Sequence, residues 1–236
     1  MSFTYKGIHA SEMGLEVASE LEFAAPERRM DLVPVPGRDG ILAIDNGGYM
    51  TVSQRIPCHL KLPAGIGFEE ALTEIHNWLH FDGWHDFIWD DDPDFIHRAM
   101  VHERYSTTRF LRHYGKMVAN FRLHPIKYHR NQLIERQINT GHVVDNPTSV
   151  PAKPRFRIVG TGNVTLNIGS QRLELASIQN GITVDCEDMT VVMQNGATAF
   201  SHMRTLEFPT LPPGRTAITW TGNFRVYIIP RLGALI

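Results

Sequence analysis

The sequence is poor in the features that mark export, membrane insertion and redox chemistry. Only two of its 236 residues are cysteines, and such scarcity is typical of proteins that fold in a reducing cytoplasm. Two interpretations stay open for Cys58 and Cys186: a disulfide, or two buried free thiols, which their separate strand contexts favour. No apolar run approaches the roughly 18 residues of a membrane span, and the first residues lack a signal-peptide pattern. We expect synthesis in the cytoplasm without export by a signal peptide, and no membrane span.

An excess of charge of either sign is also missing. The chain has 23 Lys and Arg against 25 Asp and Glu, for a formal net charge of −2. Without the basic footprint of nucleic-acid-binding proteins, we predict no nucleic-acid sequence recognition. A hydrophobic content of 42% with 20% charged residues is ordinary for a packed protein, and the length allows one large or two ordinary domains.

No catalytic constellation stands out. The sequence has no Gly-x-Ser-x-Gly nucleophile elbow. The stretch Gly160–Asn163 is glycine-rich, but no helix is predicted after it, so a hairpin turn is a better interpretation than a phosphate loop. The acids Asp185, Glu187 and Asp188 are of the type that glycosidases use, yet no aromatic-lined groove accompanies them. We therefore predict no enzyme and no cofactor.

Histidines and aspartates give two weak metal patterns. His76 and His80 are four residues apart on a predicted helix and His85 follows them, but no glutamate comes after the first histidine and no fourth ligand is clear. The run Asp90–Asp94 could offer carboxylates to calcium, but it lacks the Asp-x-Asp-x-Asp-Gly arrangement. A solvated helix edge and an exposed turn explain these residues, and we predict no metal site.

The most distinctive stretch of the sequence is Val33–Gly40, which reads Val-Pro-Val-Pro-Gly-Arg-Asp-Gly. Its prolines exclude a central strand, and its Pro-Gly and Asp-Gly pairs signal turns. Strand-like segments, Arg28–Leu32 and Tyr49–Leu62, flank it. The pattern predicts a hairpin arm over about residues 28–62, with Arg38 at its tip. Because a solitary hairpin is marginal in water, we expect the arm to lie on another copy of this chain.

The rest of the N-terminal region is predicted to be an α+β domain over residues 1–130. Leu15–Phe23 alternates apolar and polar residues as a half-buried strand does, and so does most of Tyr114–Pro125. Phe68–Phe81 carries an apolar stripe at spacings of three and four residues, which predicts a helix that covers a sheet. Pro57 indicates an edge strand or a bulge.

Residues 131–153 lack a hydrophobic period and are rich in asparagine, glycine and proline, so we predict a linker there. Residues 154–236 then contain about eight short apolar runs separated by turn signals, which favour an antiparallel β-sandwich. These predicted strands are Arg155–Val159, Val164–Ile168, Gln171–Leu175, Gly181–Asp185, Thr190–Gln194, Leu206–Phe208, Ala217–Trp220 and Arg225–Ile229.

Taken in order and spacing, several short motifs resemble the distal tail protein (Dit) family of long-tailed, non-contractile bacteriophages. They are Phe3–Ile8 with Ser11 and Gly14-Leu15, Pro36-Gly37-Arg38-Asp39-Gly40, Pro154, Gly160–Val164, Asp185-Cys186-Glu187, Phe208-Pro209, Leu211–Gly214 and Trp220-Thr221-Gly222. The likeness spans nearly the whole chain. Each motif alone is short, and the specificity comes from their order.

This resemblance implies a mainly β protein. The N-terminal domain would be a β-sandwich-like sheet with one helix and a belt-like hairpin, and the C-terminal domain would be a galectin-like antiparallel β-sandwich. Six copies would form a ring at the tip of the virion tail, with Pro36, Gly37, Arg38, Asp39 and Gly40 at the oligomer interface. The ring would join the tail-tube protein to the tail-associated hub protein, and in many relatives it anchors a receptor-binding protein. With 236 residues, the chain would be a compact form without an inserted carbohydrate-binding module.

An alternative function is a lectin-like module that recognises a cell-surface glycan. In this interpretation Asn163 and Trp220 of the C-terminal sandwich would contact the sugar. A third class, a cell-wall hydrolase, is disfavoured by the missing catalytic constellation.

Overall fold

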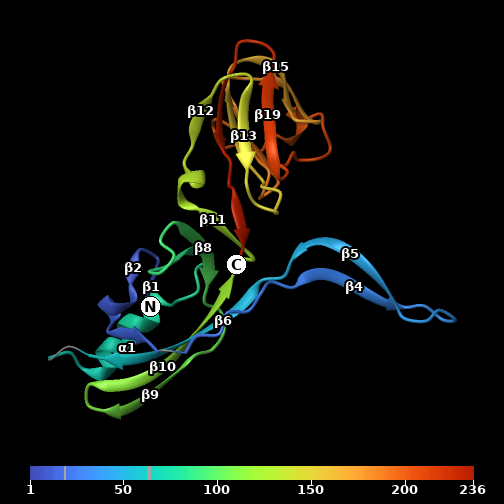
Figure 1. Ribbon diagram of the computed structural model, residues 1–236. Coiled ribbons are helices and arrows are strands. Elements are labelled where there is room, and N and C mark those ends of the chain that lie inside the picture. Colours follow the sequence, from blue (N-terminus) through green and yellow to red (C-terminus); the bar gives the residue numbers. More distant parts are fainter. Residues whose placement is uncertain (19, 63–64) are drawn as a thin grey trace. The chain divides into compact units, whose positions relative to one another are not determined.

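The computed structural model describes residues 1–18, 20–62 and 65–236. The chain is mainly β, as predicted, and α1 (Phe68–Trp78) is the one α-helix of the described residues (Figure 1). It divides into two compact units, the first made of Met1–Lys127 with Leu235–Ile236 and the second of Tyr128–Ala234. We call them the N-terminal unit and the C-terminal unit.

The N-terminal unit is built on one large antiparallel sheet. Its main path runs β2 (Ile8–His9), β1 (Phe3–Tyr5), β7 (His85–Trp89), β8 (Phe95–Met100), β10 (Tyr114–Leu123), β6 (Val52–Lys61) and β3 (Leu15–Val17). The strand β9 (Ser106–Leu111) pairs with β10 off this path. The chain leaves this unit in β11 (Ile126–His129) and returns to it in β21 (Gly233–Leu235). Short 3₁₀ turns occur at Ala10–Met13, Arg130–Leu133 and Phe200–His202.

The helix α1 covers this sheet with its apolar face, as its sequence pattern predicts. Its buried residues join a core rich in stacked aromatic rings, in which Phe3 lies 5.0 Å from Phe87 between ring centroids. The indole N–H of Trp78 donates a hydrogen bond of 2.9 Å to the backbone carbonyl of Tyr5, so that the last turn of the helix is fixed to β1. The helix ends at Trp78, earlier than the predicted Phe81. Leu79 caps it and is still buried in the core, and the exposed His80 and Phe81 follow outside the helix.

Two strand predictions in this unit need correction. The predicted strand Leu15–Phe23 is shorter, since β3 ends at Val17; within that prediction, Ser19 lies outside the described residues. Pro57 occupies an inner strand, β6, between β10 and β3. It lies just beyond the pairing of β6 with β3, which ends at Val17 opposite Cys58, and there its carbonyl accepts the N–H of Ala18 at 2.8 Å. Proline is tolerated where the ladder ends, because no further bond from its nitrogen is needed.

The C-terminal unit is an antiparallel β-sandwich, which confirms the prediction for this region. One sheet has the order β12 (Arg136–Ile138), β20 (Arg225–Ile229), β14 (Arg155–Val159), β17 (Ile182–Asp185) and β18 (Thr190–Met193). The other has the order β13 (His142–Asn146), β19 (Gly214–Trp220), β15 (Gly162–Ile168) and β16 (Gln171–Ile178). Alternate residues of the strands point inward and form one buried hydrophobic cluster.

The predicted linker 131–153 is wrong. It contains β12, which pairs with β20, and β13, which pairs with β19, so this segment supplies one strand to each sheet of the sandwich. These strands are too short to show a hydrophobic period: the apolar side chains that they bury are Ile138 and Val144. The predicted strand Leu206–Phe208 is also absent, and Leu206 is 98% exposed.

His97 on β8 makes the N-terminal unit sensitive to acid. Its side chain is 5% exposed, neither ring nitrogen has a hydrogen-bond partner among the described residues, and it lies against the ring of Phe87. Burial lowers its pKa to about 4, helped by the charge of Lys127 and opposed by Asp92. The folded state therefore holds the imidazole neutral at a pH where the unfolded chain protonates it.

We therefore expect His97→Leu to reduce the acid lability of the protein. The unfolded chain binds the proton first, so the contribution of a neutral His97 is complete above about pH 6.5 and is lost as the pH falls toward 4. Between neutral pH and about pH 4.5, wild type should lose on the order of 2 kcal/mol more stability than the variant in urea unfolding. His76→Leu, at an exposed histidine of α1, is the control. Equal pH dependence of wild type and His97→Leu would contradict this account.

Candidate functional site

A two-stranded arm forms a sheet of its own, separate from the sheets of both units. It consists of β4 (Arg28–Pro34) and β5 (Ile41–Tyr49), with Pro34 opposite Ile41 next to the turn. We call residues 28–49 the arm (Figure 1). The return strand begins directly after the turn, so the prediction that it begins at Tyr49 is wrong. The glycine pair Gly47-Gly48, which precedes the predicted start at Tyr49, lies inside β5.

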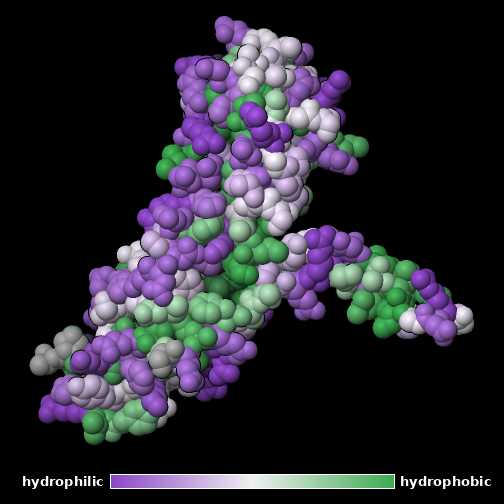
Figure 2. Space-filling view, viewed as in Figure 1, coloured by the Kyte–Doolittle hydropathy of each residue, from purple (hydrophilic) through white to green (hydrophobic). Residues whose placement is uncertain are grey.

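Both faces of the arm are apolar and exposed. Opposite residues of an antiparallel pair share a face. One face therefore carries Met30, Leu32, Pro34, Ile41 and Ala43, and the other carries Val33, Leu42 and Ile44. Every residue of β4 is exposed, as are all of β5 except its last, and the exposed fraction reaches 62% for Leu32. Figure 2 shows the hydrophobic residues gathered along the middle of the arm, with hydrophilic residues at its two ends. A patch of this kind marks an interaction surface, and here it faces two ways.

The base of the arm is held by a polar cluster. The guanidinium of Arg28 forms an ion pair of 2.6 Å with Asp45, donates to the hydroxyl of Tyr49 at 3.2 Å and lies 5.1 Å from the centre of its ring. The hydrogen bonds to Asp45 and Tyr49 raise the pKa of Arg28, and the bond from Arg28 together with the N–H of Gly47 lowers the pKa of Asp45. The cluster joins both strands beside a bulge between residues 28 and 30, so it fixes their register.

The tip of the arm is the turn that the sequence predicts. The N–H of Arg38 bonds to the carbonyl of Val35 at 3.2 Å, and Gly37 and Gly40 both have positive φ, 77° and 82°. Such φ values favour glycine, which explains the Pro-Gly and Asp-Gly pairs. Pro36 to Gly40 are all exposed. In a single copy of the chain, no described residue forms an ion pair with Arg38 or Asp39.

The residues that we predicted for glycan contact have internal roles. The side-chain carbonyl of Asn163 accepts the N–H of Ser177 at 2.8 Å, and Ser177 has a left-handed φ of 56°. The indole N–H of Trp220 donates to the carbonyl of Phe224 at 3.2 Å, and its ring packs against the core of the sandwich. The side-chain carbonyl of Asn163 and the indole N–H of Trp220 are therefore both used within the sandwich.

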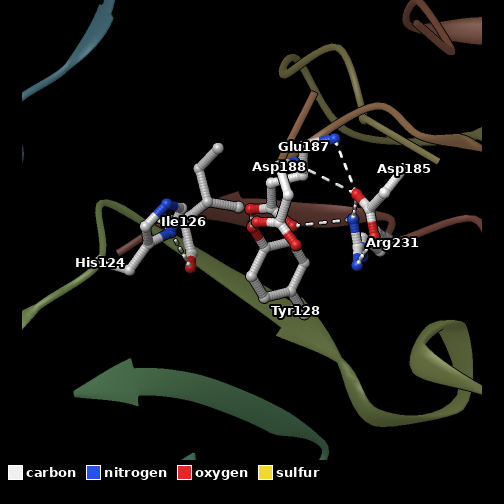
Figure 3. Close-up of polar contacts among 7 residues, drawn as sticks. All are labelled: His124, Ile126, Tyr128, Asp185, Glu187, Asp188 and Arg231. Carbon is white, nitrogen blue, oxygen red and sulfur yellow. Dashed lines mark hydrogen bonds and ion pairs between the residues drawn. The ribbon is translucent and has the colours of Figure 1, made fainter. Parts of the chain in front are cut away.

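The acids Asp185, Glu187 and Asp188 belong to a structural cluster (Figure 3). Arg231 forms a double hydrogen bond with Asp185, at 2.5 and 2.8 Å, and lies 3.3 Å from Glu187. Tyr128 donates to Glu187. Burial works against ionisation of Asp185, but the bonds from Arg231 and from the backbone N–H of Asp188 outweigh it and lower the pKa. The carboxylate of Asp185 is therefore held charged and paired with Arg231, which does not suit a general acid.

The residues of the two weak metal patterns make separate pairwise contacts in the structure. Within the described ranges, no group of three or more His, Cys, Asp and Glu side chains is placed to hold an ion. His85 pairs with Asp82 at 2.7 Å, Asp90 with His9 at 3.1 Å and Asp92 with Lys127 at 2.6 Å.

The two cysteines are buried free thiols, one in each unit. Burial raises the pKa of Cys58 and of Cys186 to about 12. The disulfide alternative is therefore wrong. Thiols of this kind are poor nucleophiles because the thiolate is the reactive form.

In the part of the chain that the structure describes, no helix has both the length and the apolar character needed to cross a membrane. Comparison of the sequence with protein-family models and with curated proteins finds no match.

Comparison with solved structures does find similar proteins. The fold is similar to that of the Dit protein (gp 19.1) of SPP1, described as a paradigm of the hub adsorption apparatus in phages that infect Gram-positive bacteria. The TM-score is 0.73 at 16% identity, over 96% of this chain and 97% of that one. A chain of the phage P2 baseplate, in its activated conformation with Ca, gives a TM-score of 0.53 at 8% identity, over 93% and 91% of the two chains. The chain therefore has the fold of a Dit protein, and the resemblance seen in the sequence is confirmed at the level of the fold.

Proposed function

We propose that this chain is a structural component of a phage tail tip, in which six copies form a ring through their arms. The observation that carries the proposal is the arm, which exposes apolar residues on two faces and has a base fixed by Arg28 and Asp45. The Dit-like fold of nearly the whole chain supports it.

Burial on both sides needs a partner surface that a single copy does not offer to these residues. A closed ring of head-to-tail contacts supplies one to every copy and leaves no arm uncovered. In this ring the turn from Pro36 to Gly40 reaches the neighbouring subunit, and Arg38 and Asp39 find their charged partners there. The apolar faces provide most of the binding free energy, since burial of a leucine or isoleucine side chain stabilises by about 1.5–3 kcal/mol.

The ring would connect the tail-tube protein to the tail-associated hub protein and anchor a receptor-binding protein. This part of the proposal rests on the fold, because the SPP1 protein of the same fold belongs to a hub adsorption apparatus. The virion tail tip is the location that follows from it.

Electron microscopy of the purified chain tests the ring, and co-purification with the tail-tube and hub proteins of the same phage tests the connection. We expect particles with six-fold symmetry that retain both proteins. Particles of another symmetry would contradict the hexamer, and rings that retain neither protein would contradict the connecting role.

A further inference from the structure

Two identical tripeptides meet in the C-terminal unit. Gln179-Asn180-Gly181 joins β16 to β17, and Gln194-Asn195-Gly196 follows β18. The N–H of Gln194 donates to the carbonyl of Gly181 at 3.3 Å, so the two turns lie side by side. Together with Met193 they line a pocket of about 330 Å³, within the size range of small-ligand sites. We call it the amide pocket.

The side-chain amides at this pocket are free. Those of Gln179, Asn180 and Gln194 make no hydrogen bond to any residue that the structure describes. Asn195 uses its side-chain carbonyl to accept the N–H of Ala197 at 3.1 Å, which leaves its NH₂ group available. A free amide offers two N–H donors and a carbonyl acceptor. Several exposed groups of both kinds, none of them bonded within the described chain, therefore line one small volume.

The backbone around the pocket, in contrast, is largely paired. Gly181 donates to the carbonyl of Gln179 at 2.8 Å, Met193 donates to Ala197 at 2.8 Å, and Gly196 donates to Met193 at 2.9 Å. An extended peptide that adds to a sheet needs free backbone groups along the edge. The free groups here belong to side chains, which suits a ligand with separate polar groups and not a peptide strand.

We infer that the amide pocket binds a neutral saccharide. No charged residue lines it, so an ionic ligand finds no counter-charge. A sugar hydroxyl both donates and accepts a hydrogen bond, as an amide side chain does, and the flexible apolar side chain of Met193 can cover the C–H face of a sugar ring. This site is not the one that the sequence suggested, because neither Asn163 nor Trp220 lines it. It is also independent of the ring proposal, since the arm is not part of this unit.

The test measures binding of the full-length protein to an array of neutral oligosaccharides that contain glucose, galactose, N-acetylglucosamine or rhamnose, with neutral peptides on the same array. We expect binding to at least one saccharide class. The double variant Gln179→Ala with Gln194→Ala should weaken it at least about tenfold, because each substitution removes hydrogen bonds to the ligand. Gln137→Ala, at an exposed glutamine of β12 in the same unit, should bind as wild type does.

A further variant separates an effect on binding from an effect on folding. Asn180 has a φ of 63°, which aspartate also tolerates, so Asn180→Asp keeps the backbone and replaces the NH₂ donors with a charge. It should weaken binding without changing the thermal midpoint. Absence of binding to every saccharide, binding to peptides alone, or saccharide binding that the double variant and Asn180→Asp leave unchanged would each overturn the inference.

Discussion

Replacing Leu32 and Ile41 with aspartate should convert the assembled protein into folded monomers of 26.8 kDa. The two side chains lie on one face of the arm, at 62% and 59% exposure. Burial in an interface stabilises each by about 1.5–3 kcal/mol, and a buried unpaired carboxylate costs more than this gain. Each contact between neighbours should therefore weaken by more than about a hundredfold. Analytical ultracentrifugation reports the mass, and circular dichroism reports whether the monomers are folded.

Two further variants make this result specific. Leu206→Asp changes a leucine that is 98% exposed in the C-terminal unit, and it should leave the assembly intact. Leu42→Asp with Ile44→Asp changes the opposite face of the arm and should also give monomers, because both faces are covered in the ring. If the Leu42 and Ile44 variant assembled normally, only one face of the arm would be buried.

Arg231→Met should destabilise the C-terminal unit by about 3–5 kcal/mol, because it leaves the buried Asp185 without its cationic partner. The arginine is 7% exposed, and so is Asp185. Urea unfolding followed through Trp220, a tryptophan of this unit, measures the change. Since the bonds from Arg231 keep the pKa of Asp185 low despite its burial, the stabilisation is present above the ordinary pKa of an aspartate and is lost as the pH falls below it.

The matched control is Arg157→Met. Arg157 pairs with Glu135 at 2.5 Å in the same unit, but the two side chains are 36% and 33% exposed. Exposed ion pairs contribute about 1 kcal/mol or less, so this variant should unfold close to wild type. An equal loss of unfolding free energy in the two arginine variants would show that the buried ion pair stabilises the unit no more than the exposed one does.

The sequence predicts those helices and strands whose hydrophobic pattern is contained within the element itself. β14 and β20 begin and end where their apolar alternation does, and α1 begins where predicted because its stripe is periodic over several turns. The strands β12 and β13 bury only one apolar side chain each, so no hydrophobic period exists to detect. Their place in the sandwich is decided by the partners β20 and β19.

The candidate sites show the same limit. The turn at the tip of the arm could be predicted, because the Pro-Gly and Asp-Gly pairs that form it are adjacent in the sequence. The pairing of Arg28 with Asp45 joins residues that are far apart along the chain, and only the register of β4 with β5 reveals it. The amide pocket likewise combines two turns, each of which is an ordinary turn signal by itself. The pairing of distant strands brings the two turns together, and the amino-acid composition gives no information about that pairing.

The most direct test of the central claim is the mass of the purified chain in solution, measured by light scattering over a range of concentrations. A ring of six copies predicts six times 26.8 kDa, about 160 kDa. The variant with aspartate at positions 32 and 41 should give the mass of one copy under the same conditions. A wild-type mass of one copy at every concentration would contradict assembly through the arm.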